Sequence, residues 1–197
     1  MMINCPETKK QGKLIVVSGP SGVGKGTILK SVFRRSDFPL VMSVSATTRS
    51  PRPGEKDGID YHFFTREEFD RRREQGDFLE CCEVFGSGYM YGTLRAEVET
   101  ALNHGRWIVL EIDVEGAEKV LKVFPDAETI FIMPPDLGSL ESRLRGRKTE
   151  SPEAMRKRLE QCRQEIELGQ KYKYRIVNDH LETAVDEFLQ ILKNLSV

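Results

Sequence analysis

Three glycines followed by a lysine and a fourth glycine come after a short apolar segment near the start of the chain. After residues 14–18 come Gly19, Pro20, Ser21, Gly22, Val23, Gly24, Lys25, Gly26 and Thr27. Glycines let the backbone turn tightly and aim successive N–H groups inward, and the following helix offers its positive N-terminal end to a phosphate. The lysine adds a cation for the β- and γ-oxygens. The segment therefore predicts a phosphate-binding loop that holds a nucleoside triphosphate between a buried strand and a helix.

The residue after Lys25 departs from the usual pattern of such loops. Gly26 stands where a Ser or Thr usually follows the lysine, and the hydroxyl comes one residue later at Thr27. The usual hydroxyl is a Mg²⁺ ligand. The sequence thus predicts no direct magnesium ligand in this loop.

The composition favours one packed domain whose charged groups act locally. The chain has 197 residues, with 30 basic residues against 31 acidic ones. Burial becomes more efficient with size, so this length suffices for one α/β core. Because the charges nearly cancel, no global field favours nucleic acid or a membrane surface. We expect neither as a partner, and the sequence predicts no oligomeric state.

The cysteines and the N-terminus indicate a cytoplasmic protein. Cys5, Cys81, Cys82 and Cys162 lack metal-ligand spacing, and the adjacent pair would lie on opposite faces of a strand. Residues 1–13 are too polar for a signal peptide, and no apolar run approaches the roughly 18 residues of a membrane span. We therefore expect reduced thiols.

Strand and helix patterns alternate along most of the chain. Apolar runs predict buried strands at 107–112, 129–133 and 175–177, and the segments 117–124, 137–145 and 151–168 read as helices. An amphipathic C-terminal helix carries Leu181 and Phe188 on its apolar side. Residues 41–93 differ, because short extended pieces at 41–46, 60–64 and 78–83 are broken by Pro and Gly. This stretch predicts an inserted, partly antiparallel subdomain. Within it, Thr65 and Glu68 have the spacing of a helix capping box.

The insertion carries two arginines three residues apart. Arg49 and Arg52 lie beside several hydroxyls and two prolines. A guanidinium suits phosphate because its planar fork gives paired, charge-assisted hydrogen bonds. Taken alone, the segment could equally be a solvated polar loop.

Several motifs in a fixed order resemble guanylate kinase. Besides residues 19–27 and 43–54 they are Asp60-Tyr61, Phe78-Leu79-Glu80, Tyr91-Gly92-Thr93, Glu111-Ile112-Asp113 with Gly116, Arg143-Leu144-Arg145-Gly146-Arg147 and Ile176-Val177-Asn178-Asp179. The resemblance covers about residues 13 to 193. It implies a P-loop NTPase fold, α/β with a three-layer core on a parallel sheet. It also implies the reversible ATP-dependent phosphorylation of GMP, and of dGMP, in purine nucleotide metabolism, with Mg²⁺ as cofactor.

The resemblance also implies the boundaries of the domain and its parts. Residues 1–12 would form an N-terminal extension of a single domain over 13–193. Its core comprises 13–42, 94–136 and 172–197, the GMP-binding subdomain 43–93, and the helical lid 137–171.

The same resemblance implies roles for the acceptor-site residues. The clamp on the GMP phosphate would be Arg49, Arg52, Tyr61 and Tyr91, and the guanine readers would be Ser45, Glu80, Thr93 and Asp113. The chemistry agrees, because guanine N1–H and N2–H₂ can both donate to a carboxylate such as that of Glu80. Adenine offers no N1 donor, and sites built on such hydrogen bonds discriminate by about 10⁴ to 10⁵. Asp113 follows a predicted parallel strand, at whose carboxyl end ligands bind.

For the donor side, the resemblance implies that Lys25 and the loop amides hold the ATP phosphates. Arg143, Arg147 and Arg158 would come with the lid, and Arg49 would link the acceptor and transferred phosphates. Arg143 and Arg147, four residues apart, would share one helical face. Asn178 would touch the adenine of ATP. Such a reaction needs in-line positioning and charge neutralisation.

The chain departs from the family pattern at three places. Residues 81–90 are about two residues longer than usual, Glu111 replaces the commoner Asp, and Lys148 stands where Gly is frequent. The longer carboxylate would move a magnesium-bound water.

Two other functions remain open at this point. A different nucleoside monophosphate kinase would share the loop and the lid, but Glu80 and Ser45 argue against it. A guanylate-kinase-like scaffold domain would bind phosphorylated peptides without catalysis, but such domains typically lack an intact ATP loop.

Overall fold

A parallel sheet forms the centre of the molecule. The computed structural model describes residues 12–83, 88–145 and 152–196, with the backbone alone for 143–145 and 152–154. The sheet has the strand order β2-β7-β1-β8-β9, and every neighbouring pair is parallel. Its strands are β1 (Lys13–Ser18), β2 (Leu40–Met42), β7 (Trp107–Glu111), β8 (Glu128–Met133) and β9 (Tyr174–Val177). The apolar runs of β1, β7 and β8 are buried, as expected for a sheet covered on both faces.

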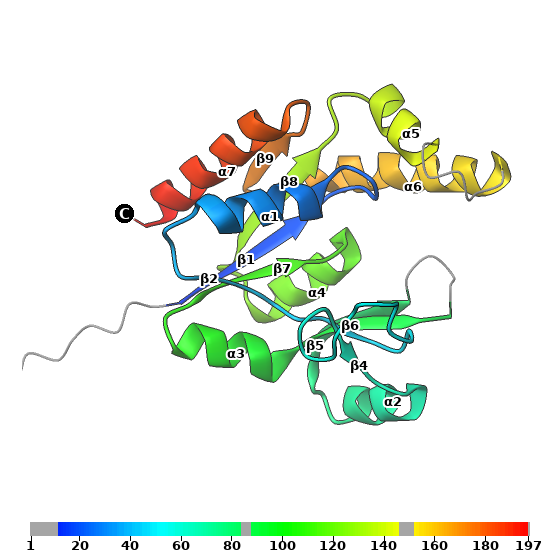
Figure 1. Cartoon of the computed structure of the whole chain (residues 1–197), viewed down its shortest axis with the longest axis vertical. Helices are drawn as coiled ribbons and strands as arrows, with labels where there is room; N and C mark the ends of the chain where they lie inside the picture. Colours follow the sequence, from blue (N-terminus) through cyan, green and yellow to red (C-terminus); the bar gives the residue numbers. More distant parts are fainter. Residues whose placement is uncertain (1–11, 84–87, 146–151, 197) are drawn as a thin grey trace, which may run out of the picture.

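Helices cover both faces of this sheet, in three layers (Figure 1). On one face, α1 (Lys25–Arg35) and α7 (Leu181–Leu195) bury Ile28, Val32 and Phe188 against it. On the other face, α3 (Arg95–Asn103) and α4 (Val114–Val123) bury Val98 and Val120. The predicted three-layer α/β core is confirmed.

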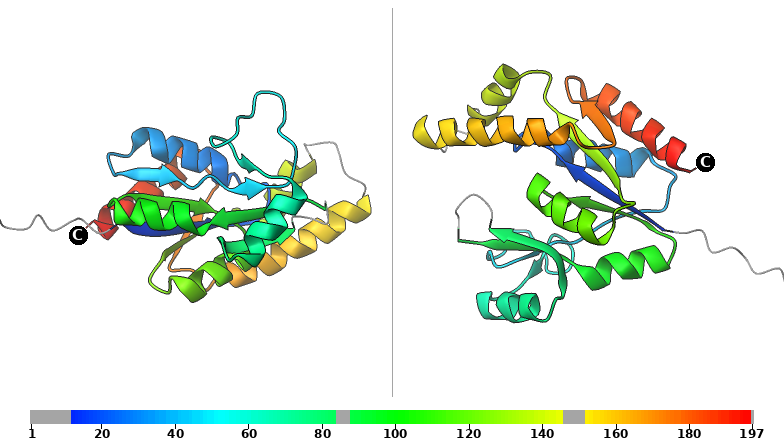
Figure 2. Two further views of the ribbon diagram at one scale, coloured as in Figure 1. Left: turned by 90° about the horizontal axis from the view of Figure 1, so that it is seen from below. Right: turned by 180° about the vertical axis from the view of Figure 1, so that it is seen from behind.

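A second, smaller sheet lies beside the core (Figure 2). Its strands are β3 (Ala46–Thr47), β4 (His62–Phe63), β5 (Phe78–Glu83) and β6 (Met90–Leu94), in the order β4-β3-β6-β5. The helix α2 (Arg66–Glu74) packs on it through Phe69, whose ring stacks on that of Phe78 with centroids 4.4 Å apart. As the capping-box spacing predicts, the Thr65 side chain accepts from Glu68 N and begins this helix.

Two helices complete the fold on the far side of the core. They are α5 (Leu137–Arg145) and α6 (Pro152–Gly169), and α6 forms the long arm at the upper right of Figure 1. The buried residues Leu140 and Cys162 join them to the α1 side of the core. The second sheet and α6 thus lie on opposite sides of the carboxyl ends of β1 and β7.

Two predicted elements need correction, and one helix was not predicted. The extended piece expected at 41–46 is two strands in two different sheets, because the chain leaves the core after Met42 and enters the second sheet at Ala46. The helix α3 was not predicted. The helix α4 begins at Val114, three residues before the expected 117, because Asp113 caps it. No helix among the described residues is long and apolar enough to cross a membrane.

Candidate active site

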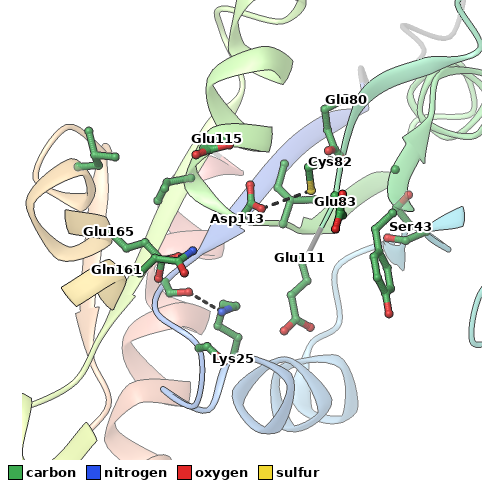
Figure 3. A pocket seen from close by; sticks show the side chains of 18 of the residues that line it. Lys25, Ser43, Glu80, Cys82, Glu83, Glu111, Asp113, Glu115, Gln161 and Glu165 are labelled. Carbon is green, nitrogen blue, oxygen red and sulfur yellow. Dashed lines mark hydrogen bonds between the residues drawn. The ribbon is translucent and has the colours of Figure 1, made fainter. Parts of the chain in front are cut away.

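A cavity of about 540 Å³ lies between the second sheet and α6. The phosphate loop and the ends of β2 and β7 also contribute to its wall. Figure 3 shows Glu80 and Cys82 on one side, Gln161 and Glu165 on the other, and Lys25 with Glu111 between them. Because ligands in open α/β sheets bind at the carboxyl ends of the strands, this is the expected place for a substrate.

The phosphate loop has the conformation that its glycines predict. Gly24 has a φ of 99° and precedes the first residue of α1. A Cβ on Gly24 would lie 2.6 Å from Nδ2 of Asn178, so the position has no room for a side chain. The loop leads from the central strand β1 into α1, whose N-terminus therefore points at the cavity.

Lys25 folds back over this loop. Its Nζ donates to the carbonyl oxygens of Gly19 at 2.5 Å and Pro20 at 3.3 Å. Burial lowers the pKa of Lys25, and the carboxylate of Glu111 opposes that shift. The Lys25 side chain thus lines the cavity at the phosphate loop.

Two side chains from distant segments brace the loop. Asn178 is buried, and its amide donates to Val23 O at 2.7 Å. Arg158 of α6 donates to Oγ of Ser21 at 2.7 Å. Asn178 therefore contacts the loop itself, and Arg158 links α6 to the same loop.

Glu80 reaches the cavity because β5 contains a bulge. The pairing of β5 with β6 shifts register between Phe78 and Glu80. Phe78 packs in the small cluster under α2, whereas Leu79 packs against the main core. Leu79 and Glu80 consequently lie on the same side of the strand, which strict alternation would not allow.

The Glu80 carboxylate is held by a neighbouring hydroxyl. Glu80 is 6% exposed, and its Oε1 accepts from Oγ1 of Thr93 at 2.7 Å. Burial raises the pKa of Glu80 to about 6, the Thr93 hydrogen bond lowers it, and Asp113 raises it. The carboxyl group is therefore mostly ionised at neutral pH.

Asp113 caps α4 at the edge of the same cavity. Its Oδ1 accepts from Gly116 N at 2.7 Å, while Sγ of Cys82 lies 3.5 Å from Oδ2. Burial, followed by the Asp113 charge, raises the pKa of Cys82 to about 12, so this thiol stays protonated. Cys81 packs instead in the cluster under α2, which confirms that the two cysteines face opposite ways.

The four residues expected to clamp a phosphate are only partly gathered at the cavity. Tyr61 and Tyr91 line it, while Arg49 and Arg52 do not; Ser45, expected as a guanine reader, also lines it. The rings of Tyr61 and Tyr91 meet edge to face with centroids 5.9 Å apart. Arg49 lies over the Tyr61 ring at 5.4 Å, adjacent to this pair, and Arg52 is exposed.

Two of the expected lid arginines lie partly or wholly outside the described residues. Arg143 belongs to α5, but its side chain is outside the described residues, as is the whole of Arg147. The expectation that they share one helical face therefore stays a prediction.

The cavity has an acidic wall that the sequence did not reveal. Lys25 is the one lysine or arginine among its described lining residues. The carboxylates that line it are Asp60, Glu80, Glu83, Glu111, Asp113, Glu115 and Glu165. The sequence did not single out Glu165 as a cavity residue, because it is one acidic residue among many on α6. Its burial raises its pKa. A polyanionic ligand here requires further cations.

Comparison with known proteins gives a consistent family. The guanylate kinase family model matches residues 11–195. A guanylate kinase of Rhodopirellula baltica is 49% identical over 94% of this chain and 90% of its own length. A guanylate kinase of Clostridium perfringens is 46% identical over 97% and 87%. The crystal structure of a guanylate kinase from Anaplasma phagocytophilum aligns with a TM-score of 0.72 at 36% identity, over 94% of this chain and 87% of that one.

Proposed function

We propose, from the premise that this chain belongs to the guanylate kinase family, that it transfers the γ-phosphoryl group of ATP to GMP within the cavity described above. The overall reaction is ATP + GMP ⇌ ADP + GDP. The buried, ionised carboxylate of Glu80 on the wall of a cavity whose floor is a phosphate loop carries this assignment. One end of the cavity offers acceptors for a base, and the other offers donors for phosphates.

We assign guanine recognition to Glu80, with Thr93, Ser45 and Asp113 around it. A carboxylate accepts from N1–H and N2–H₂ together. Adenine would leave this buried group facing a lone pair, and an unpaired buried charge is costly. The hydrogen bond from Thr93 supports the assignment, because it fixes the orientation of the carboxylate.

We assign the GMP phosphate to Tyr61 and Tyr91 together with Arg49 and Arg52. The two phenols line the cavity, and phenol hydroxyls donate to phosphate oxygens. Arg49 stacks on Tyr61, which supports its place beside the same phosphate. The exposed Arg52 would complete the clamp as the nucleotide binds.

We assign the ATP phosphates to residues 19–27. The loop N–H groups and the α1 N-terminus would hold the β-phosphate, and Nζ of Lys25 would exchange its carbonyl partners for β- and γ-oxygens. The hydrogen bond from Arg158 to Ser21 holds this arginine against the phosphate loop, which supports its proposed role as a lid arginine. Arg143 and Arg147 keep their proposed roles on family resemblance alone, as does the adenine contact of Asn178.

The described residues fit a magnesium ion that arrives with ATP. They contain no group of three or more His, Cys, Asp or Glu side chains arranged to hold a metal by themselves. The Glu111 carboxylate, however, faces Gly26: a Cβ there would lie 3.7 and 3.9 Å from its two oxygens. We propose that Glu111 holds the ion through water on this open side of the loop. When bound, Mg²⁺ neutralises phosphate charge that the acidic wall would otherwise repel.

The chain's own contribution to the transfer is positioning and charge neutralisation. The guanine readers and the phosphate clamp would aim a GMP phosphate oxygen at the γ-phosphorus, while Lys25 and the arginines neutralise the equatorial oxygens. Closure of the second sheet and the lid over both nucleotides would exclude water and so limit ATP hydrolysis. The substrates and the free thiols of Cys81, Cys82 and Cys162 support a cytoplasmic location.

An acceptor panel tests this function. Rates are measured with ATP and Mg²⁺ against GMP, dGMP, AMP, CMP and UMP. We expect efficient turnover of GMP and dGMP and poor turnover of the other three. Equal rates with AMP would refute guanine recognition, and phosphopeptide binding without turnover would support the scaffold alternative.

A further inference from the structure

Arg49 forms a two-pronged ion pair with Glu55 in the loop after β3. Its Nη1 lies 3.0 Å from Oε2 of Glu55, and its Nη2 lies 3.0 Å from Oε1. The two side chains are 12% and 20% exposed. The Arg49 guanidinium holds the pKa of the Glu55 carboxyl below its ordinary value. Such bidentate geometry distinguishes the pair from an ordinary surface salt bridge.

Glu55 also ties the second arginine into the loop. The N–H of Arg52 donates to Oε2 of Glu55 at 2.7 Å, and Glu55 N donates to the carbonyl oxygen of Arg52 at 3.0 Å. One carboxylate therefore joins the side chain of Arg49 to the backbone of Arg52. Glu55 therefore helps to fix the positions of both arginines assigned to the GMP phosphate.

The donors of Arg49 are divided between two edges of its guanidinium. Of its five N–H groups, those of Nη1 bind Glu55 and the carbonyl oxygen of Ser50 at 2.8 Å, and one on Nη2 binds Glu55. Nε is buried with no hydrogen-bond partner among the described residues. The Nε–H and the second Nη2–H lie along one edge, the fork that binds a phosphate in bidentate fashion. The Arg49 side chain also interacts with Tyr91, which is assigned to the same phosphate. Contacts with the rings of Tyr61 and Phe63 hold the guanidinium in place.

We propose that Glu55 is a positioning residue for the acceptor phosphate: it binds the outer edge of Arg49 so that the Nε–Nη2 edge is directed to GMP. This inference rests on the proposed assignment of Arg49 to the GMP phosphate. The carboxylate does not compete with the phosphate, because the two anions use different edges of one guanidinium. The negative charge of Glu55 is also stabilised by Arg52, whose N–H donates to the carboxylate and whose charge helps to lower its pKa.

The test measures GMP and guanosine binding calorimetrically for the wild type, Glu55→Gln, Arg49→Ala and the double variant. Glu55→Gln should weaken GMP binding about ten- to hundred-fold, as for a lost charged hydrogen bond. Guanosine, which lacks the phosphate, should bind as in the wild type. In the Arg49→Ala background Glu55→Gln should have no further effect on GMP. The control is Glu74→Gln, an exposed glutamate on α2 of the same subdomain, which should change neither affinity.

Unchanged or tighter GMP binding by Glu55→Gln would overturn the proposal, and tighter binding would identify Glu55 as a competitor of the phosphate. An equal loss of affinity in the Arg49→Ala background would also overturn it. If Glu55→Gln lowers the melting temperature, Glu55→Asp supplies the comparison, because it keeps the charge but cannot reach both guanidinium nitrogens. It should weaken GMP binding and spare guanosine. A wild-type protein that binds no GMP would refute the proposed site, not the role of Glu55 alone.

Discussion

The Thr93 hydroxyl donates to Oε1 of Glu80 at 2.7 Å, while Oε2 of the same carboxylate lies beside Gly116 on the neighbouring helix α4. The carboxylate is thus oriented from one side by a hydrogen bond and from the other by packing. Its burial keeps its pKa near 6 despite the Thr93 donor. This orientation of the carboxylate supports the proposed role of Glu80 in reading the base.

The first prediction concerns pH. Because the pKa of Glu80 is about 6 and guanine donors need the ionised form, guanosine affinity should fall as the pH is lowered from 7 to 5. The expected loss is about ten-fold at one unit below the pKa. Guanosine is used because the phosphate of GMP itself titrates near pH 6. Glu80→Gln should remove this pH dependence, and an unchanged profile in the wild type would contradict the role of Glu80.

The same pKa predicts a gain in stability on removing the charge. The folded state raises the pKa of Glu80 from 4.5 to about 6, so the protonated form favours folding. The stabilisation that the protonated Glu80 gives the folded state is complete below pH 4.5 and is lost as the pH rises through 6. Glu80→Gln should therefore raise the free energy of unfolding at pH 7 by about 1–2 kcal/mol. Urea unfolding at pH 7 and pH 4 measures this, and a variant less stable at pH 7 would show that the charge itself is stabilising.

Substitution of Lys25 should lower turnover without weakening the binding of GMP. Lys25→Ala removes the buried cation at the phosphate loop, and turnover should fall by about a hundred- to a thousand-fold. GMP affinity should stay within a few-fold, because the proposed acceptor site lies at the other end of the cavity. Steady-state rates and GMP titration measure the two effects. Lys122→Ala, at an exposed position on α4, is the matched control. Near-normal turnover of Lys25→Ala would remove this residue from the mechanism.

Gly116 should be required for guanine reading. A Cβ there would lie 3.1 Å from Oε2 of Glu80 and 3.2 Å from Oδ1 of Asp113, tighter than ordinary contact. Gly116→Ala should displace the carboxylate and weaken GMP binding by about 1–3 kcal/mol, the usual range for overpacking. ATP affinity should not change. Calorimetry with each nucleotide measures this, and a GMP affinity equal to that of the wild type would show that the carboxylates can shift without loss.

Most of the core could be predicted from the sequence because its signals are local. The apolar runs of β1, β7 and β8 and the glycine spacing at 19–24 each specify a conformation without reference to distant residues. The helix α3 lacked a strong signal, since Leu94 before it provides no side-chain cap and Val98 is its one buried residue. Propensity alone was too weak a guide there.

The site was predictable in its residues but not in its geometry. Alternation along β5 would place Leu79 and Glu80 on opposite faces, and only the bulge opposite β6 brings both to the core side. Similarly, nothing in the spacing of Arg49 and Glu55 shows that their side chains pair. Such contacts depend on the path of the loop between β3 and β4, which tertiary packing determines.

The central claim is that Glu80 selects guanine, and the ratio of kcat/KM for GMP to that for AMP in Glu80→Gln tests it most directly. Glutamine keeps the shape but offers one oxygen acceptor in place of two. GMP efficiency should fall about ten- to hundred-fold, as for a charged hydrogen bond, while AMP stays a poor substrate, so the ratio narrows. The control is Glu74→Gln, at an exposed position on α2 outside the cavity lining, which should leave the ratio unchanged. A folded Glu80→Gln enzyme that keeps the wild-type ratio would contradict the account and move specificity to Ser45, Thr93 or Asp113.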